Sequence, residues 1–444
     1  MKKEIQLSEH FSYTKLLRFT LPSIVMMVFT SLYMVVDGVF VSNYVGKTAF
    51  AAINLIMPFL MMFASIGFMV GTGGSALVAK TLGEGKREKA NSLFSMLLSI
   101  LFICGIVLAI IGIAFIDEII LFLGAEGEMI KDCRLYALWL LPVLPAYLLQ
   151  SAFQAFFVAA ERPKIGMIVT LTAGATNIVL DYLFIVVFDW GLIGAAFATT
   201  VSQCVGGLYP LLYFAFPNKS LLHLTKWNFD SKALSKTCLN GSSELVTNIS
   251  MSLVVMLYNF QLIKYIGEDG VAAFGVIMYV SYIFISLFLG YSIGSAPIVS
   301  FNYGAENKAE LSNVYNKSIV IIIALSLFLT LLAYVLSSPL SKIFVGYDQG
   351  LYSLTLKGFR IYSLSFLLAG MNICASAFFT ALNNGIISAC ISFSRTLIFE
   401  TSAVIFIPLL FGIDGIWSAI IFAECASLLL VLLFIKTNRK KYGF

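Results

Sequence analysis

Residues 191–203 read GLIGAAFATTVSQ, and residues 412–424 read GIDGIWSAIIFAE, so a similar motif recurs 221 residues further along the chain. The same ungapped shift aligns further identical residues in the first part of each half, including Gly73 with Gly294. A shared register at half the chain length indicates an internal duplication. The sequence therefore predicts two copies of one structural unit in tandem.

The composition places these two units in a membrane. The 444 residues are 60% hydrophobic and 11% charged, whereas soluble domains are about 45–50% apolar and about 25% charged. Apolar stretches that can cross a layer of about 30 Å as helices of about 20 residues recur throughout. We predict twelve spans, at residues 14–43, 50–79, 92–123, 133–160, 166–188, 191–216, 236–264, 271–300, 314–345, 352–382, 386–411 and 413–435. The expected fold is an all-α membrane protein with two six-helix lobes related by a parallel internal repeat.

The predicted domains follow from this repeat. Residues 1–217 form the N-terminal lobe, residues 218–235 a polar, basic linker, and residues 236–444 the C-terminal lobe. Most Lys and Arg residues fall in the N-terminal segment, the linker, the C-terminal tail and other loops on the same side. An excess of basic residues marks the cytoplasmic side of a membrane protein. We therefore expect a multi-pass protein of the inner (cytoplasmic) cell membrane with both termini in the cytoplasm.

Several function classes lack the residues that they need. The sequence has no GxxxxGK[ST] phosphate loop, and its seven cysteines and two histidines follow no metal-ligand spacing. GTGGSA at residues 71–76 closes a span, so we interpret it as a surface for close helix packing. No basic block is interleaved with exposed aromatic residues as nucleic-acid binding requires. We expect a monomeric protein that is not an enzyme, has no cofactor and uses an ion gradient.

Two aspartates lie within long apolar runs, Asp37 in SLYMVVDGVFV and Asp181 in NIVLDYLFIVV. An ionisable side chain at membrane depth costs at least about 2.5 kcal/mol on insertion scales, so chains rarely carry one without a use. Asn177 precedes Asp181 by four residues and shares its helix face. The amide and the carboxylate can therefore hold one ion or proton together.

Thr199 on the following span could add a hydroxyl oxygen to this group. Carboxylate, amide and hydroxyl oxygens suit either H⁺ or Na⁺, so the residues leave the coupling ion open. The alternatives are a structural carboxylate at Asp181 and a Thr199 hydroxyl bonded to its own helix backbone. Under the repeat, Asp37 aligns with Tyr258 and Asp181 with Ser402, so the predicted ion-coupling site belongs to the N-terminal lobe alone.

Pro22 lies fifteen residues before Asp37 in the first predicted span. Proline removes a helical hydrogen bond and can allow a bend, through which protonation of Asp37 could change the shape of the helix. Alternatively, Pro22 marks the start of the helix. The sequence is compatible with both interpretations.

Acidic residues also occur in the C-terminal lobe, where Arg395 is the only clear basic residue at depth. A net acidic interior favours cationic substrates, and we predict that Glu244 and Glu400 line the substrate cavity. Two alternatives stay open: Glu400 can form an ion pair with Arg395, and Glu244 can be solvated near the cytoplasmic end. Glu424 aligns with Gln203 under the repeat, which suggests a shared packing or polar role.

Methionines are frequent in the first two spans, and Met34 and Met61 are among them. Flexible thioethers suit a cavity that accepts substrates of many shapes. We include both residues in the predicted substrate cavity. Packing and lipid contact are the alternative.

A combination of motifs resembles the multidrug and toxic compound extrusion (MATE) family. The motifs are LPS (21–23) with VDGVFV (36–41), LGEGKREKAN (82–91), AAERPKIG (159–166), NIVLD (177–181), GLIGAAFAT (191–199) and GIDGIWSAIIFAE (412–424). The resemblance covers nearly the whole chain and looks most like the bacterial MepA-like and DinF-like branches. It implies two lobes around a central cavity that opens alternately to either side of the membrane.

The resemblance also implies roles for particular residues. The family's positions implicated in H⁺ or Na⁺ coupling match Asp37, Asn177, Asp181 and Thr199, and its first-helix proline matches Pro22. Glu244 does not clearly match the seventh-helix acid of the other bacterial branch.

The sequence therefore predicts an antiporter in the lipid bilayer that exports amphipathic organic cations and drugs in exchange for H⁺ or Na⁺. The alternative among transporters is a flippase for lipid-linked substrates of the wider superfamily. Such a flippase would need basic residues to bind pyrophosphate, whereas this interior carries acids. A membrane enzyme would need a catalytic cluster at one membrane face, and the short loops lack one.

Overall fold

The computed structural model describes residues 5–444, apart from the side chains of Val39 and Lys47. Every regular element in this range is a helix, as predicted. In chain order the elements are α1 (Tyr13–Phe40), η1 (Val41–Val45), α2 (Lys47–Gly83), α3 (Arg87–Ala114), α4 (Ile116–Phe122), α5 (Glu128–Leu140), η2 (Leu141–Val143), α6 (Leu144–Ala159), α7 (Pro163–Asp181), η3 (Tyr182–Val187), α8 (Gly191–Ala215), α9 (Ser231–Tyr265), α10 (Glu268–Gly304), α11 (Lys308–Val345), α12 (Gln349–Ser363), α13 (Phe366–Ala381), α14 (Gly385–Phe393), η4 (Ser394–Glu400) and α15 (Thr401–Tyr442).

The helices agree with twelve membrane spans. Within the described range, ten helical segments are long and apolar enough to cross a membrane, and α12 with α13 forms an eleventh that bends by 48°. The last of the ten, Gly385–Tyr442, has 58 residues, far more than the roughly 20 that one crossing needs. Gly412 interrupts it with a φ of 58°, so this segment supplies two crossings.

The predicted linker is shorter in the structure than in the sequence analysis. Helix α8 ends at Ala215, and α9 begins at Ser231, so residues 231–235 of the predicted linker are helical. The Asp230 side chain causes this early start, because it accepts a hydrogen bond from the Ala233 backbone N–H at 3.0 Å. Such a side-chain cap satisfies one of the free N–H groups in the first turn of a helix.

The internal repeat is visible in the backbone. Residues with positive φ break the helices at equivalent places in the two halves, and these pairs are Gly46 with Gly267, Gly85 with Glu306, and Gly191 with Gly412. Each pair is separated by the 221 residues of the sequence repeat. Glycine occupies five of these six positions, since it adopts positive φ without a steric penalty. The duplication therefore sets where both halves turn.

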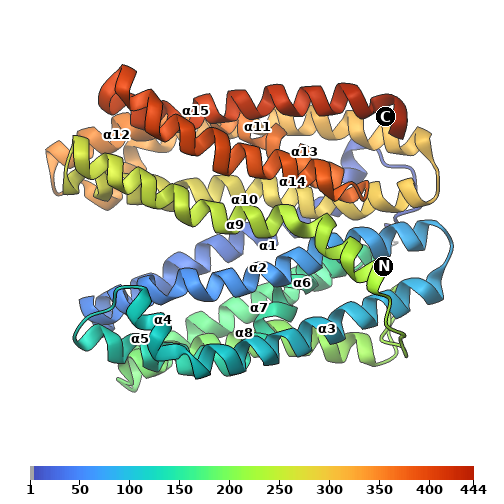
Figure 1. The fold of residues 1–444 in the computed structure, drawn as a ribbon, viewed down its shortest axis with the longest axis horizontal. Helices are drawn as coiled ribbons and strands as arrows, with labels where there is room; N and C mark the ends of the chain where they lie inside the picture. Colours follow the sequence, from blue (N-terminus) through green and yellow to red (C-terminus); the bar gives the residue numbers. More distant parts are fainter. Residues whose placement is uncertain (1–4) are drawn as a thin grey trace.

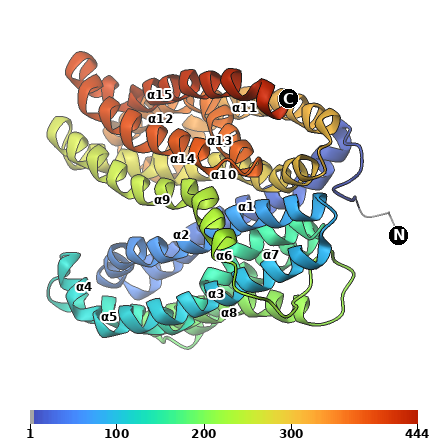
Figure 2. The same ribbon diagram turned by 45° about the vertical axis from the view of Figure 1, so that its right-hand side comes forward.

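Two helical bundles lie side by side in Figure 1, one built from α1–α8 and the other from α9–α15. We call them the N-terminal and C-terminal lobes. Both ends of the chain lie at the same end of the molecule, where Leu7 and Phe11 share an apolar cluster with Tyr442 and Phe444. We call this the terminal end. Away from it, α9 and α10 diverge from α1 and α2 in both views (Figures 1 and 2).

Small residues bring the lobes into close contact near the terminal end. A side chain on Gly241 of α9 would collide with the Met69 carbonyl of α2, and one on Gly304 of α10 with the Lys80 carbonyl of α2. Gly73, from the GTGGSA segment, similarly faces the backbone of α9, which confirms its predicted packing role. Glycine permits this backbone-to-backbone approach between membrane helices. The lobes are therefore closed against each other at the terminal end.

Candidate functional site

The two N-terminal-lobe acids lie where regular helix gives way to a wider turn. Asp37 is in the last turn of α1, just before the π-helical segment η1. Asp181 is the last residue of α7 and is followed directly by the π-helical segment η3. π-Helical turns are rare and occur frequently at functional sites. Both acids therefore lie at irregular points of the helices that carry them.

Helices α1 and α7 pack together and bring Asp37 and Asp181 face to face, so that the two carboxyl groups interact. Asp181 is completely buried. Neither Asp181 oxygen nor Oδ1 of Asp37 has a hydrogen-bond partner of good geometry among the described residues. An unpaired buried carboxylate is unfavourable, and two adjacent ones repel each other. One proton or one cation between them would relieve both costs.

Asn177 and Thr199 extend this acid pair toward α8. Asn177 is 2% exposed and lies one turn before Asp181 on α7. Its Nδ2 lies 3.5 Å from the Thr199 Oγ1, at the outer limit of a hydrogen bond. Because the amide nitrogen faces the hydroxyl, the amide oxygen of Asn177 stays available to another donor or cation. The structure thus brings all four predicted ion-coupling residues together.

Tyr136 is a member of this site that the sequence analysis missed. It lies on α5, is 1% exposed, and its phenol group interacts with Asp37, Asp181 and Thr199. It falls within the predicted fourth span, but tyrosine is common in apolar helices and nothing in the local pattern marks it. A buried phenol usually finds a hydrogen-bond partner. Here the phenol group lies close to the Thr199 hydroxyl and near the carboxyl groups of Asp37 and Asp181.

The chemistry of these groups favours a proton or a hard monovalent cation. The donors are carboxylate, amide, hydroxyl and phenol oxygens, without a thiolate or imidazole. Among the described residues, no group of three or more His, Cys, Asp or Glu side chains converges as a metal site. The site therefore offers little to a transition metal, which prefers imidazole and sulfur ligands.

Pro22 lies inside α1, which begins nine residues earlier at Tyr13. The interpretation of Pro22 as the start of the helix is therefore wrong. Because proline has no N–H, the Arg18 carbonyl one turn earlier loses its usual helical donor. Pro22 is buried, next to Ser23 and Ile24, whose backbone contacts Gly290 of α10. A bend at Pro22 would therefore act at the contact between the lobes.

Arg395 pairs with Glu424 in the C-terminal lobe, so the alternative of an ion pair between Arg395 and Glu400 is wrong. The guanidinium donates from Nη2 to Oε1 of Glu424 at 2.6 Å and from Nε to the same oxygen at 2.9 Å. Asn372 donates to Oε2 at 2.6 Å. The packing of α15 against η4 makes this pair possible. Glu400 is half-buried and lies within reach of the Arg395 charge, but it forms no hydrogen bond or ion pair within residues 5–444.

The other predicted cavity residues lie on helices at the boundary between the lobes. Glu244 is half-buried on α9, three residues after the interface glycine Gly241, and therefore lies on the same side of that helix. Met34 on α1 and Met61 on α2 are 39% and 36% exposed. Their assignment to a substrate cavity stays a prediction.

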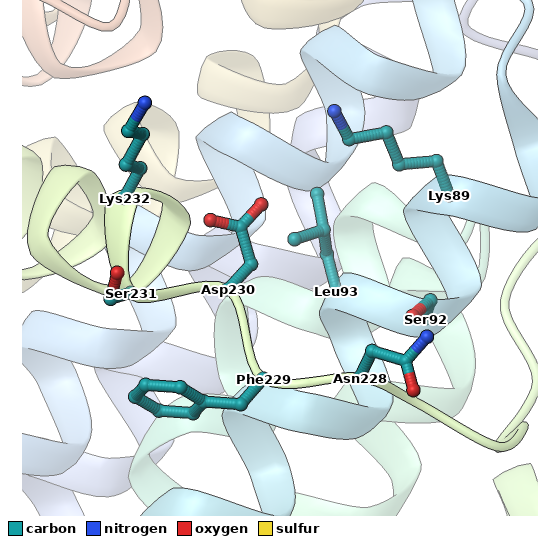
Figure 3. A pocket seen from close by; sticks show the side chains of 8 residues that line it. All are labelled: Lys89, Ser92, Leu93, Asn228, Phe229, Asp230, Ser231 and Lys232. Carbon is teal, nitrogen blue, oxygen red and sulfur yellow. The ribbon is translucent and has the colours of Figure 1, made fainter.

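A separate hollow of about 420 Å³ lies at the terminal end, between the start of α3 and the start of α9. Figure 3 shows the lysines on either side of it and Asp230 between them. Its lining residues are Lys89, Ser92, Leu93, Asn228, Phe229, Asp230, Ser231 and Lys232. Because Asp37 lies near the opposite end of α1, this hollow is not part of the acid site.

Comparisons with known proteins agree with this architecture. The family model MatE matches residues 22–183 and 245–406, two segments of equal length, one in each lobe. The multidrug export protein MepA of Staphylococcus haemolyticus is 22% identical over 436 residues, which cover 96% of this chain and 94% of MepA. MepA of Staphylococcus aureus strain MRSA252 is likewise 22% identical, with the same coverage.

The fold also matches a solved structure closely. The chain superposes with a TM-score of 0.93 on a structure described as the outward-facing conformation of a multidrug resistance MATE family transporter of the MOP superfamily. The match covers 100% of this chain and 99% of that one at 22% identity. The two-lobe fold deduced from the repeat is therefore the fold of that transporter.

Proposed function

As a member of the MatE family, the chain is a membrane transporter and not an enzyme, and we propose that it exports small organic cations in exchange for H⁺ or Na⁺. The observation that carries this proposal is the face-to-face pair of Asp37 and Asp181, whose buried oxygens lack partners among the described residues. Such a pair holds a proton or cation in one state of the transporter and loses it in another.

Alternating access would couple this ion to the substrate. The lobes are in close contact at the terminal end and diverge at the other, so the structure represents one of the two required states. Ion binding at Asp37 and Asp181 changes the charge between α1 and α7, and α1 also packs on α10 of the other lobe. A charge change there biases the lobe arrangement, since a ligand shifts a two-state equilibrium by its differential affinity for the two states.

The substrate class follows from the charge of the interior and from the relatives. Glu244 and Glu400 add negative charge in the C-terminal lobe, while Arg395 is neutralised by Glu424. A surface of net negative charge attracts cations. The related MepA proteins are multidrug export proteins, which supports a broad range of substrates.

The membrane and its orientation belong to the same proposal. The basic loops and both termini lie at the terminal end, so we assign this end to the cytoplasm. We place the protein in the inner (cytoplasmic) membrane of the cell, as a monomer. The divergent end then faces outward. The structure in this orientation would be ready to release substrate and bind the coupling ion.

Transport in inverted membrane vesicles tests the proposal. Ethidium uptake into vesicles that contain the wild-type protein should accelerate with either an imposed pH gradient or an imposed Na⁺ gradient. Asp37→Asn and Asp181→Asn should each remove this acceleration, because an amide cannot take up a proton and neutralises a cation less well. Asp189→Asn makes the same change at an exposed loop position and should transport as the wild type does.

Two results would contradict the proposal. Full gradient-driven transport by both aspartate variants would rule out the acid pair as the coupling site. Ethidium uptake that ignores both gradients in the wild type would rule out ion-coupled export of this substrate.

A further inference from the structure

The segment that precedes α1 crosses from one lobe to the other at the terminal end. Residues 5–12 are not helical, yet Leu7 and Phe11 are fully buried. Both side chains join an apolar cluster with Ile298 of α10 and Leu311 of α11 in the C-terminal lobe, and with Val158 of α6 in the N-terminal lobe. An N-terminal segment of a domain is ordered when such contacts tie it down.

Glu310 of α11 anchors this segment to the C-terminal lobe. The Phe11 backbone N–H donates to Oε1 of Glu310 at 2.8 Å, and the His10 ring nitrogen Nδ1 lies 2.6 Å from Oε2. The Phe11 carbonyl accepts from the Asn313 side chain at 3.0 Å and from Lys317 Nζ at 2.6 Å. Four polar contacts therefore hold residues 10 and 11 on α11.

Glu161 anchors the same segment to the N-terminal lobe. It lies in the turn between α6 and α7, with a positive φ of 61°, and its Oε1 accepts the Leu7 backbone N–H at 2.6 Å. Burial raises the pKa of the Glu161 carboxyl, and the bond from Leu7 opposes that rise. A short hydrogen bond to a carboxylate is among the stronger kinds.

We propose that residues 5–12 form a latch that holds the two lobes closed at the terminal end, with Glu310 as its anchor on the C-terminal lobe and Glu161 as its anchor on the N-terminal lobe. Glu161 and Glu310 are positioning residues that contact neither substrate nor ion. The proposal rests on the alternating access of the proposed function, but not on which ion drives it.

The contact between the lobes next to residues 5–12 links the latch to the opening of the terminal end. The half of α1 that follows the latch packs on α10 of the C-terminal lobe, where Gly290 and Gly294 face the α1 backbone around Thr20 and Ile24. The start of α1 is thus held by the C-terminal lobe at both the latch and the helix. When the terminal end opens, the distance between Glu161 and Glu310 must change, and the contacts of residues 5–12 with at least one of the two acids must break.

Hydrogen–deuterium exchange on the full chain in lipid nanodiscs tests the latch. Glu161→Ala should speed exchange roughly tenfold or more in residues 5–12, because a hydrogen bond to a charged group is lost. Exchange should also rise in residues 69–73 and 237–241, which form the lobe contact, because opening of the terminal end exposes them. Transport is not needed for this readout, so failure of the latch is distinguishable from failure of ion coupling.

Glu306→Ala is the matched control. Glu306 is also an acid at positive φ in a turn of the terminal end, but it is exposed. Hydrogen–deuterium exchange of the Glu306→Ala variant should equal that of the wild type in residues 5–12, 69–73 and 237–241. Glu161→Gln keeps an oxygen acceptor and should restore most of the protection, which a general loss of folding would not do.

Leu7→Pro removes the backbone N–H that donates to Glu161, whereas Glu161→Ala removes the acceptor. Leu7→Pro should therefore raise exchange in the same residues as Glu161→Ala does. If Glu161→Ala does not yield folded protein, Leu7→Pro supplies the test on its own. Wild-type exchange in residues 69–73 and 237–241 of the folded variants would overturn the proposal.

Discussion

Asp181 in the N-terminal lobe and Glu424 in the C-terminal lobe are equally buried, but their surroundings differ. Neither oxygen of Asp181 has a hydrogen-bond partner in the described part of the chain, whereas Arg395 and Asn372 bond both oxygens of Glu424. The repeat aligns Arg395 with Gly174, so the N-terminal lobe has no base at the equivalent place.

Gly174 shows what replaces the arginine. It lets the rings of Phe29 and Tyr33 on α1 approach α7 closely, which brings Asp37 of the same helix toward Asp181. One lobe therefore neutralises its buried acid with a basic side chain, whereas the other has no basic side chain bonded to its acids among the described residues. If the proposed function holds, this difference separates a structural charge from one that can take part in transport.

The largest expected effect is on stability, from Glu424→Gln. This change leaves the Arg395 guanidinium, which is only 17% exposed, without its bonded counter-charge, and breaking a buried ion pair in this way costs about 3–5 kcal/mol of unfolding free energy. Thermal unfolding of the detergent-solubilised protein should show a clearly lower midpoint. Asp414→Asn is the control, because its pair with Lys357 is solvent-exposed and worth about 1 kcal/mol or less.

The double variant Arg395→Met with Glu424→Leu sharpens this test. Since it removes both charges, most of the lost stability should return. An unfolding midpoint of Glu424→Gln equal to that of Asp414→Asn would show that the buried pair is not structural.

The second-largest expected effect is the loss of transport in Asp181→Asn. Unlike Glu424→Gln, this variant should not lower the unfolding midpoint. The amide removes an unpaired buried carboxylate, so the unfolding midpoint should stay unchanged or rise. The acceleration of transport by the ion gradient should be lost, because the amide cannot take up the proton and neutralises a cation less well. A fall in the midpoint as large as that of Glu424→Gln would make Asp181 a structural acid and end the contrast between the lobes.

Both the fold and the four-residue grouping at Asp37 could be predicted from the sequence, for physical reasons. Apolar runs and the 221-residue register reflect the bilayer and the duplication directly, and a spacing of four residues places Asn177 and Asp181 on one face of any helix. These features depend on local geometry. The structure accordingly places them as expected.

The partners of Arg395 and the presence of Tyr136 depend instead on how distant helices pack. Glu400 is nearer to Arg395 in sequence than Glu424 is, but α15 places Glu424 against the guanidinium. Tyr136 reaches Asp181 from α5, which lies 45 residues earlier in the chain. The sequence pattern of either helix alone carries no information about such contacts.

The smallest expected effect concerns Tyr136. Its phenol group belongs to the N-terminal-lobe site, and no tyrosine hydroxyl bonds Glu424 among the described residues. Tyr136→Phe keeps the ring and removes one hydroxyl, and loss of one neutral hydrogen bond costs about 0.5–1.5 kcal/mol. The concentration of the driving ion that gives half-maximal transport should therefore rise between about twofold and tenfold. Tyr182→Phe makes the same change at an exposed residue beside Asp181 and should leave that concentration unchanged. If Tyr136→Phe behaves like Tyr182→Phe, the phenol only fills space beside the acids, and the site consists of the four residues that the sequence predicts.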